Sequence, residues 1–526
     1  MPCCKAKEYI EWCIDLPVVD YRDKDGNEYC VFHAPVGQKG ISLEEFNGLV
    51  FARISKAKQE NKPCDLTDTI FEGGIKFVGF DKDNPLPEII FLGAIFSGGA
   101  DFSGATFGGA VSFQLATFSG KADFLGATFS DIADFTEARF GKTAYFRWAT
   151  LRKTAWFVQA KFRETSDFAE ATFSGLVDFT GATFMETSDF FGATFSRKAD
   201  FLGATFSETT YFRKTTFSGR AHFREVKFSR EANFGWTTFS GGADFTGKTF
   251  NREADFRSLN LEGKSRFEGV NLRRASFLDT DLRKIDFINP IWPKWCGRHL
   301  LYDEIRLFKE ITKGDIKTQD EATFSSRHWL KELLNKLKQR FTREWKGFKK
   351  DISCNKVEIK KVEILYRMLK QKYKGEHNEP EVSNWHYGEK EMFRKGSLFR
   401  RYCPLSLSNL YWLSSGYGER PVRAGIVLFL FILAISVLFG LTGLSSNPSL
   451  EEKSLYEVTE IKCLADIFQK GFAGLVANTL QYATFEKEPD FVPNTIYGTF
   501  LRIAARILIP LQTALLALAV RNRFRR

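Results

Sequence analysis

A large apolar residue recurs between Phe91 and Leu272 at alternating steps of five and six residues, in units that read Ala-Asp-Phe-x-Gly-Ala-Thr-Phe-Ser-x-x. We call these 34 positions the comb. Phe occupies 31 of them, and the other three are Leu151, Leu261 and Leu272. A small residue stands two positions before the comb residue. This unbroken register indicates an internal repeat rather than a core assembled from mixed elements.

The comb excludes a long helix and a continuous strand. At ~100° per residue, steps of five and six place successive Phe side chains on separate sides of a helix, and the units are rich in Gly, Thr and Ser. In a continuous strand, a step of five would move the next Phe to the opposite face. A chain that turns a corner every five or six residues keeps every Phe inside. Because such units bury their faces only by stacking, the comb predicts a solenoid with coils spaced by ~4.8 Å.

The units at 100–104 (Ala-Asp-Phe-Ser-Gly) and 199–203 (Ala-Asp-Phe-Leu-Gly) resemble the pentapeptide-repeat family, in its Phe-rich type. The family repeat is a small residue, a polar residue, Leu or Phe, and two variable positions. The resemblance covers residues 91–287 and implies a mainly β fold, a right-handed quadrilateral β-helix with four repeats per coil. One residue is inserted here in every second repeat. Each coil would therefore use about 22 residues, and the comb would form about 8.5 coils, ~40 Å long at the strand spacing.

Four regions follow from the limits of the comb. The repeats are expected to begin loosely near Phe71 and to stop at Pro290, which lacks a backbone donor. An open solenoid end needs a cap, and Trp292, Trp295 and the segment 300–308 are expected to supply it at the C-terminal end. The predicted regions are an N-terminal Cys/His module (1–70), the β-helix (71–290), a basic helical cap and juxtamembrane region (291–420) and a two-span transmembrane domain with a re-entrant-like loop helix (421–526).

The N-terminal module holds a candidate metal site. Cys4, Cys13, Cys30 and His33 are spaced C-x8-C-x16-C-x2-H, and Cys3 is a spare first ligand. Structural Zn²⁺ takes four S or N ligands, and a close Cys30 and His33 pair can form half of such a site. The alternative is a set of buried thiols in a reducing compartment beside a hydrogen-bonded histidine. Structural zinc, as a cap on the first coil, is the one cofactor that the sequence suggests.

The positive charge of the chain is concentrated in residues 291–423. They carry 29 basic and 17 acidic side chains, whereas the whole chain has a net charge of +11. This basic collar precedes a long apolar stretch, so we expect it to bind anionic lipids on the cytoplasmic side of a membrane, and we expect no nucleic acid. Within it, residues 328–350 have the spacing of an amphipathic helix, and 357–373 and 381–395 are expected to form a helical pair.

Two apolar stretches, 424–444 and 497–520, are long enough to cross ~30 Å of hydrocarbon. Their outer flanks are basic and the connecting loop is acidic, which predicts a membrane protein with both termini in the cytoplasm. Arg502 and Arg506 lie one helical turn apart in the second stretch. They either snorkel to the interface or line a polar cavity that binds an anionic group. Gln512 is expected to make a polar contact inside an assembly, which suggests a homo-oligomer.

The segment between the two stretches has a channel-like order. Residues 467–484 have the length of a re-entrant or pore helix, and the arrangement resembles two-transmembrane ion-channel subunits. A potassium filter would need the backbone carbonyls of a Thr-Val-Gly-Tyr-Gly type loop. Residues 486–490 (Glu-Lys-Glu-Pro-Asp) stand in that place, and the Gly-Tyr-Gly at 416–418 comes before the first stretch. The likeness therefore extends to the order of segments and not to the filter.

The sequence contains no HExxH, no complete phosphate-binding loop and no Cys-x-x-Cys, so we expect no enzyme. The favoured prediction is an integral membrane protein that presents a cytoplasmic β-helix as a binding or scaffolding surface for a protein partner. One alternative is a degenerate two-transmembrane channel gated through the solenoid. Another is a topoisomerase inhibitor that mimics DNA, as some members of the resembled family do. The near-neutral balance of residues 91–287, with 25 basic and 23 acidic side chains, disfavours it.

Overall fold

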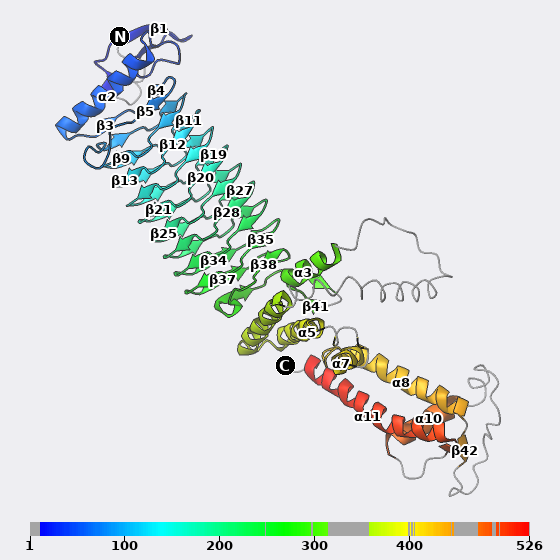
Figure 1. Cartoon of the computed structure of the whole chain (residues 1–526). Helices are drawn as coiled ribbons and strands as arrows, with labels where there is room; N and C mark the ends of the chain where they lie inside the picture. Colours follow the sequence, from blue (N-terminus) through cyan, green and yellow to red (C-terminus); the bar gives the residue numbers. More distant parts are fainter. Residues whose placement is uncertain are drawn as a thin grey trace. The chain divides into compact units, whose positions relative to one another are not determined.

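The chain divides into two compact units, Met1–Gln319 and Asp320–Arg526, which are described separately. The first contains the β-structure and the second contains mostly helices (Figure 1). The amphipathic helix expected at 328–350 lies outside the described residues. The computed structural model describes residues 11–247, 249–295, 298–313, 357–397, 400, 403, 406–442, 444–446, 472–485, 491–493 and 495–524.

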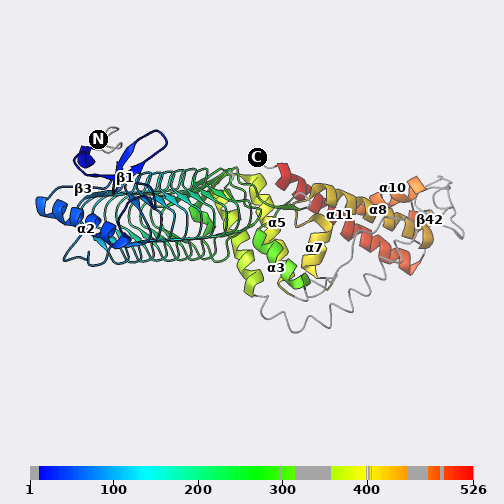
Figure 2. The same cartoon turned by 90° about the horizontal axis from the view of Figure 1, so that it is seen from above.

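The first unit is a parallel β-solenoid with four sides, which confirms the predicted fold class. Its strands form four sheets of 11, 8, 10 and 8 strands. The regular coils repeat every 22 residues, so that Val111 pairs with Ala133 and Phe118 with Phe140. Figure 2 shows the coils stacked along one axis. The sheets run from β3 (Cys64–Asp65) to β39 (Ile285–Ile288), from β4 (Ile70–Phe71) to β31 (Lys227–Phe228), from β5 (Ile75–Lys76) to β38 (Ala275–Ser276), and from β9 (Thr106–Phe107) to β36 (Asn260–Leu261).

Most strands of the solenoid are two residues long, and two kinds alternate along the chain. In one kind a buried small residue precedes an outward polar one, as in β8 (Ala100–Asp101). In the other an outward polar residue precedes a buried Phe, as in β9. Side chains alternate across an extended backbone, so each short side directs a small residue and a Phe inward. The small residue leaves room for the ring beside it.

The comb side chains fill the interior in four columns. Rings of one column stack nearly parallel from coil to coil: the centroid of Phe179 lies 4.7 Å from that of Phe157 and 5.0 Å from that of Phe201. Adjacent columns meet edge to face, and Phe179 lies 5.6 Å from Phe168 at 87°. Aromatic pairs of these geometries contribute about 0.5–1.5 kcal/mol beyond their buried area. The prediction that the comb points inward is confirmed.

The corners of each coil explain the other residues of the repeat. On five-residue sides the second residue after Phe has a left-handed backbone, as Gly104 does with φ +68°. On six-residue sides the coils approach closely, and a Cβ on Gly175 would lie 2.1 Å from the Lys153 carbonyl oxygen. The Asp before Phe accepts a hydrogen bond from the backbone two residues later: the Thr180 N–H donates to Asp178 at 2.8 Å. The frequent Asp-Phe pair therefore stabilises the corner.

The N-terminal module covers the first coil. It contains a hairpin of β1 (Val18–Arg22) and β2 (Glu28–Cys30), followed by α2 (Leu43–Glu60). The helix begins with a capping box formed by Ser42 and Glu45. Phe46 of α2 is buried, and its ring lies 6.0 Å from Phe71, so the aromatic core continues into the module. The first sheet already begins at β3, ahead of the start expected near Phe71.

The C-terminal end of the solenoid has the cap that the sequence predicts. Trp292 is 3% exposed, and its ring lies 5.2 Å from Phe287. The hairpin β40 (Lys294–Trp295) and β41 (Arg298–His299) leads to α3 (Tyr302–Lys313). At the start of α3, Asp303 accepts hydrogen bonds from the Ser276 hydroxyl at 2.5 Å and the Phe277 N–H at 2.9 Å. Burial raises the pKa of Asp303 to about 6.

The second unit begins with the predicted helical pair, formed by residues 357–375 and α5 (Glu379–Lys395). Tyr366 and Trp385 are fully buried between the two helices, with ring centroids 5.9 Å apart. Arg367 of the first helix donates to Glu389 of α5 at 2.9 Å. Part of the basic charge expected in the collar is thus used in ion pairs between these helices.

The other helices form an antiparallel hairpin with a short helix packed against it. After α7 (Leu407–Ser415), α8 (Pro421–Thr442) and α11 (Ile496–Phe524) lie side by side (Figure 1). Their adjoining strands, β42 (Leu444–Ser446) and β43 (Phe491–Pro493), pair antiparallel. The core between α8, α10 (Phe472–Ala483) and α11 is made of Ile435, Phe439, Tyr482, Ala483, Ala505 and Ile509. Both α8 and α11 are long and apolar enough to cross a membrane.

Candidate functional site

A tight turn after β2 brings Cys30 and His33 together. The His33 and Ala34 N–H groups both donate to the Cys30 carbonyl oxygen, at 3.0 and 2.9 Å. This turn places Cys30 Sγ 3.2 Å from His33 Nδ1. The local Cys-Val-Phe-His sequence thus brings the two side chains of the predicted half-site together.

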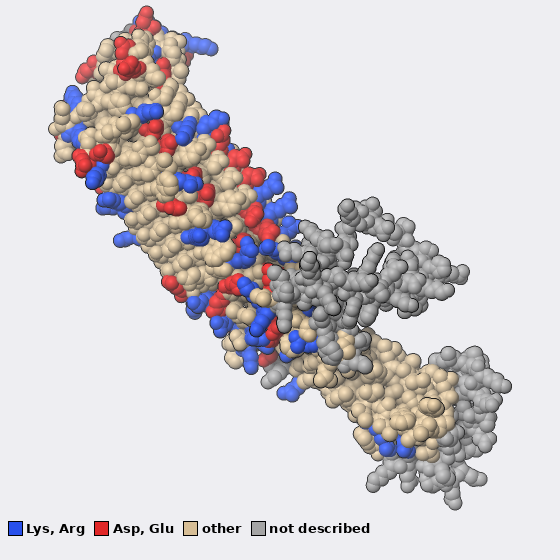
Figure 3. Space-filling view, in the orientation of Figure 1, with Lys and Arg blue, Asp and Glu red and all other residues tan. Residues whose placement is uncertain are grey.

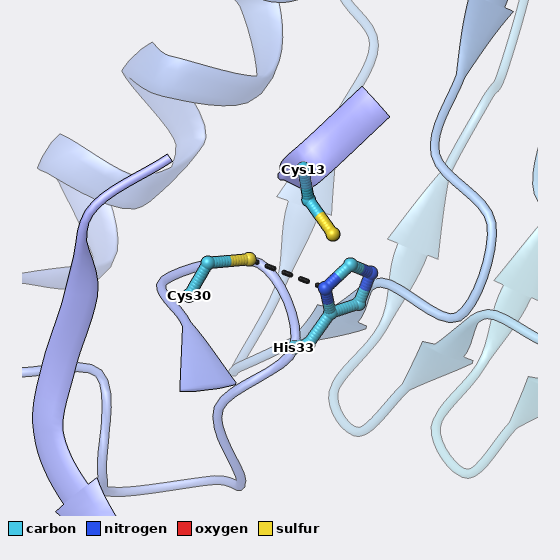
Figure 4. Close-up of side chains that lie close together, drawn as sticks. All are labelled: Cys13, Cys30 and His33. Atoms are coloured by element: carbon cyan, nitrogen blue, oxygen red, sulfur yellow. Dashed lines mark hydrogen bonds between the residues drawn. The ribbon is translucent and has the colours of Figure 1, made fainter. Parts of the chain in front are cut away.

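Cys13 joins this pair from a short 3-10 helix, η1 (Glu11–Cys13). The ligand atoms of Cys13, Cys30 and His33 all lie within 4.8 Å of one another, and the three residues are buried. Figure 4 shows the Cys13 sulfur directed toward the other two side chains. Of the residues predicted as ligands, Cys4 lies outside the described residues, as does the spare ligand Cys3. The structure therefore brings together the three predicted ligands that it describes.

A contact with the first coil fixes the orientation of His33. Its Nε2 lies 3.1 Å from the Thr67 carbonyl oxygen. Because a carbonyl only accepts, Nε2 carries the proton and donates, which leaves the Nδ1 lone pair directed at the sulfur atoms. A ligating histidine is held in the same way when its second nitrogen donates to a backbone carbonyl. The 34-residue separation of His33 and Thr67 hides this contact in the sequence.

Two cationic side chains lie beside the thiols. Lys39 is buried, donates to the carbonyl oxygens of Phe32 and Ala34 at 3.3 Å, and has its pKa lowered by burial to about 8. The guanidinium of Arg53 lies 3.7 Å from the ring centroid of Trp12. Arg53 also interacts electrostatically with both Cys13 and Cys30. Positive charge near a thiol favours the thiolate, which is the form that binds metal.

Cys64 gives a contrast within the same part of the molecule. It opens the first sheet in β3 and is 1% exposed. Burial raises the pKa of its thiol to about 11. This is the behaviour of a structural cysteine that packs as a small apolar residue.

Gln512, one of the polar residues predicted in the second apolar stretch, joins three helices within one chain. Its amide nitrogen donates to the Ser414 carbonyl of α7 at 2.8 Å and to the Ala424 carbonyl of α8 at 2.9 Å. The side chain is 2% exposed. Gln512 therefore holds the end of α7 and the start of α8 against α11.

Arg502 and Arg506 are partly buried on α11 and interact electrostatically with Tyr482 of α10. Nearby, the hydroxyl groups of Ser436 in α8 and Thr479 in α10 lie 2.9 Å apart and are buried. The short helix thus provides polar contacts to α8 and lies beside both arginines. The structure thus places Arg502 and Arg506 beside α10, whereas Gln512 contacts α7 and α8.

The solenoid surface exposes aromatic side chains that sequence reasoning did not single out. Trp148 is 54% exposed and Trp236 is 46% exposed. The Arg213 guanidinium lies 4.5 Å from the Trp236 ring centroid, and Trp148 donates to Glu170 at 3.0 Å. On the face in Figure 3, cationic and anionic side chains are interspersed along the solenoid. In the sequence, these exposed Trp residues could be found as a Trp at the corner position with a left-handed backbone. Other coils have glycine at this position: Gly104, Gly126, Gly192 and Gly203.

Family comparisons agree with this architecture. Residues 91–139, 126–172, 157–205, 190–235 and 212–259 match a family model described as pentapeptide repeats (9 copies), and residues 252–287 match one described as pentapeptide repeats (8 copies). Residues 91–287 of the solenoid therefore match models of pentapeptide repeats. These matches cover the comb and its C-terminal continuation. No curated protein matches the chain, and no solved structure does.

Proposed function

We propose that this protein is a membrane-anchored, non-enzymatic scaffold that presents its pentapeptide-repeat solenoid to a protein partner in the cytoplasm. The observation that carries the proposal is the exposure of the two apolar helices. In the most apolar 18-residue windows of α8 and α11, 28% and 22% of the residues are buried. A core helix of a soluble domain would bury most of such a window, so these helices need an apolar environment outside the chain.

The exposed side chains on these helices are large and apolar. Phe429 in α8 is 63% exposed and Leu430 is 52% exposed, while Ile507 and Leu511 in α11 are 58% and 56% exposed. At ~25 cal/mol per Å² of apolar surface, hydrating both helices would cost many kcal/mol. A lipid bilayer removes this cost.

The antiparallel hairpin supports a two-span topology with both flanks on one side of the membrane. Arg420 and Arg423 stand at the start of α8, and Arg521 stands near the end of α11. Basic residues next to spans favour the cytoplasmic side, where anionic lipids attract them. The proposal therefore places the termini and the solenoid in the cytoplasm, with the β42–β43 end of the hairpin on the other side.

The exposed aromatic residues support a binding role for the solenoid. Trp and Arg are enriched at the energetic centres of protein interfaces. Trp148 and the Arg213–Trp236 pair place such groups on a stack whose aromatic core keeps the coils in fixed register. The interspersed charges do not resemble the acidic surface of a DNA mimic. A protein surface is therefore the partner that this chemistry fits best.

Fractionation of the full chain tests the anchor. We expect the protein to remain with membranes after alkaline carbonate extraction and to need detergent for purification. The double substitution Leu430→Lys and Ile507→Lys should release it or prevent its insertion, whereas the control Leu176→Lys, at an exposed solenoid position, should not. A wild-type chain that is monodisperse without detergent would contradict the proposal. Labelling of a cysteine introduced at the exposed solenoid position 176 (Leu176→Cys) only after permeabilisation would support the orientation.

In-cell cross-linking of the full chain tests the scaffold role. Cross-links to a discrete partner should map to the coils around Trp148 and Trp236. They should weaken at least tenfold in the Trp148→Ala and Trp236→Ala double variant, because truncating interface Trp residues costs about 2 kcal/mol or more. Leu176→Ala serves as the control. Cross-links that are unaffected by both Trp substitutions would contradict this use of the surface.

A degenerate ion channel is the second candidate, favoured by the position of α10 between two spans and beside Arg502 and Arg506. This proposal requires a homo-oligomer that encloses a pathway. It predicts a tetramer in detergent and a conductance in reconstituted bilayers that Arg502→Gln or Arg506→Gln alters. A monomer without conductance would leave α8 and α11 as an anchor.

A further inference from the structure

We propose that Cys13, Cys30 and His33 bind one zinc ion that fastens the N-terminal module to the first coil of the solenoid. This goes beyond the scaffold function, because it concerns how one end of the solenoid is closed. Two thiols and one imidazole are the ligand types of structural zinc sites. Carboxylate-preferring ions such as Mg²⁺ or Ca²⁺ would not select this set.

The distances fit a metal centre with little rearrangement. Bond lengths of about 2.3 Å to sulfur and about 2.0–2.1 Å to nitrogen put tetrahedral ligand atoms about 3.6 Å apart for S and N. Cys30 Sγ and His33 Nδ1 are 3.2 Å apart, and the widest separation within the trio is below 4.8 Å. Each ligand atom therefore needs to move by roughly an ångström or less to reach a common ion.

The orientation of the His33 ring also supports a metal site. Its Nε2–H donates to the Thr67 carbonyl, so the Nδ1 lone pair faces the two sulfur atoms, and Nδ1 lies 3.2 Å from Cys30 Sγ. A histidine that only filled space would not need both nitrogens directed in this way. The same hydrogen bond ties the ligand to the first coil, where the Ile70 N–H also donates to the Phe32 carbonyl at 2.8 Å.

A metal at this point would join three segments that are distant in the sequence: η1, the turn after β2, and the chain that enters the first coil. The module between Glu11 and Asn61 is small, and small modules often need a metal or a disulfide to supplement their apolar core. A solenoid needs closed ends for solubility. The fourth ligand of a tetrahedral site would come from outside the trio.

Metal analysis of the purified full chain tests this inference. Protein from zinc-supplemented cells should contain close to one zinc per chain. The variants Cys30→Ser and His33→Gln should each lose at least nine tenths of it. Cys64→Ser is the matched control, because it removes a buried thiol of the same region that is not among the clustered ligands, and it should retain zinc. Equal loss in Cys64→Ser and Cys30→Ser would overturn the proposal.

Cobalt substitution gives a readout that does not depend on the stability of a variant. Wild-type protein reconstituted with Co²⁺ should show the thiolate-to-metal charge-transfer band and the visible bands of a tetrahedral site, and zinc should displace them at one equivalent. Zinc below one tenth per chain, without these bands, would show buried thiols beside a hydrogen-bonded histidine instead. A Cys13–Cys30 disulfide, seen as a loss of two titratable thiols, would also overturn the proposal.

Discussion

The solenoid and the helical hairpin use the same kind of side chain in opposite ways. Phe179 in the solenoid is completely buried, whereas Phe429 in α8 is 63% exposed. Both regions are rich in large apolar residues, but one encloses them and the other displays them. The comparison shows that apolar content alone does not reveal where a region finds its apolar surroundings.

The direction of the backbone hydrogen bonds explains why the solenoid buries its large apolar side chains and the helical hairpin exposes them. In the solenoid, hydrogen bonds run between coils, as from the Phe179 N–H to the Asp200 carbonyl at 2.7 Å, so each short strand has one inner and one outer side. The outer side faces water and carries polar residues. In α8 and α11 the backbone hydrogen bonds lie within the helix and side chains radiate in all directions. Such helices suit a medium that offers no hydrogen bonds, which is the interior of a membrane.

Truncation of one Phe in each region tests the comparison most strongly. Phe179→Ala should lower the free energy of unfolding by about 3–5 kcal/mol, because it leaves a cavity between stacked rings. Phe429→Ala should lower it by less than about 1 kcal/mol, because detergent or lipid fills the space. Chemical denaturation of the full chain in non-ionic detergent, followed by circular dichroism, measures both. Phe179→Leu is the control and should cost less than Phe179→Ala, because Leu151 already occupies a comb position between Phe129 and Phe173. Similar losses for the two alanine variants would break the comparison.

The carboxyl group buried at the end of the solenoid should make its stability depend on pH. Burial raises the pKa of Asp303 to about 6, from an ordinary 3.8, although hydrogen bonds from Ser276 and Phe277 act in the other direction. The folded state thus holds the Asp303 proton more tightly than the unfolded state does, so protonation of Asp303 stabilises the fold. This stabilisation is complete below pH ~4 and is lost as the pH rises through ~6. Between pH 4 and 7, the free energy of unfolding of the wild type should therefore fall by about 3 kcal/mol relative to that of Asp303→Asn, which does not titrate. Denaturation curves of both proteins at each pH measure this change. A wild-type stability that stays constant relative to Asp303→Asn would contradict the raised pKa of Asp303.

Replacing one glycine by alanine in each region tests how tightly the solenoid and the helical hairpin are packed. Gly175→Ala should destabilise the solenoid by about 1–3 kcal/mol, because the new Cβ would lie 2.1 Å from the Lys153 carbonyl oxygen. Gly425→Ala in α8 should be neutral or stabilise by up to about 1 kcal/mol, because its Cβ would lie 4.0 Å from Leu516 and Ala favours helix. Thermal unfolding in detergent measures both changes. A larger loss at Gly425 would mean that the helices pack more tightly than the coils.

Removal of the buried amide in α11 should have the smallest effect. Gln512→Leu keeps most of the volume and loses two hydrogen bonds, to the carbonyls of Ser414 and Ala424. Polar contacts between membrane helices contribute about 0.6 kcal/mol on average, so we expect a loss of about 1 kcal/mol and a slightly lower Tm in detergent. Leu511→Ala, at an exposed position on the same helix, is the control. An unchanged Tm would show that hydrophobic packing alone holds α7 and α8 to α11.

The sequence predicts contacts that repeat or lie close along the chain. The comb spacing predicts the inward Phe and the pairing of each strand with the next coil, because one geometry is repeated many times, and the family resemblance adds the coil length. The Cys30 and His33 half-site is equally local, since a three-residue turn fixes its geometry. The helical pair of 357–375 and α5 follows from its 3.6-residue period. In each case a short segment carries enough information by itself.

Contacts between segments that do not repeat cannot be predicted from the sequence in the same way. Neither the Thr67 carbonyl that orients His33 nor the Ser414 carbonyl that binds Gln512 has a side-chain signature, because any residue can offer a backbone oxygen. Cys13 joins Cys30 and His33 only because η1 packs against the turn after β2. The start of the first sheet at Cys64 also depends on docking, since the comb is not yet regular there.

By itself, the sequence determined that a Phe ladder with steps of five and six turns a corner at every step and stacks its coils, and the resemblance to pentapeptide repeats added the four sides. Every repeat imposes the same steric demand, because the rings stay inside only if the chain turns between them. The tertiary structure decided what closes the ends of this stack and which polar groups meet. It placed His33 on Thr67, Asp303 on Ser276 and Gln512 between three helices. These contacts arise once, between segments that only packing brings together, so no period in the sequence could reveal them.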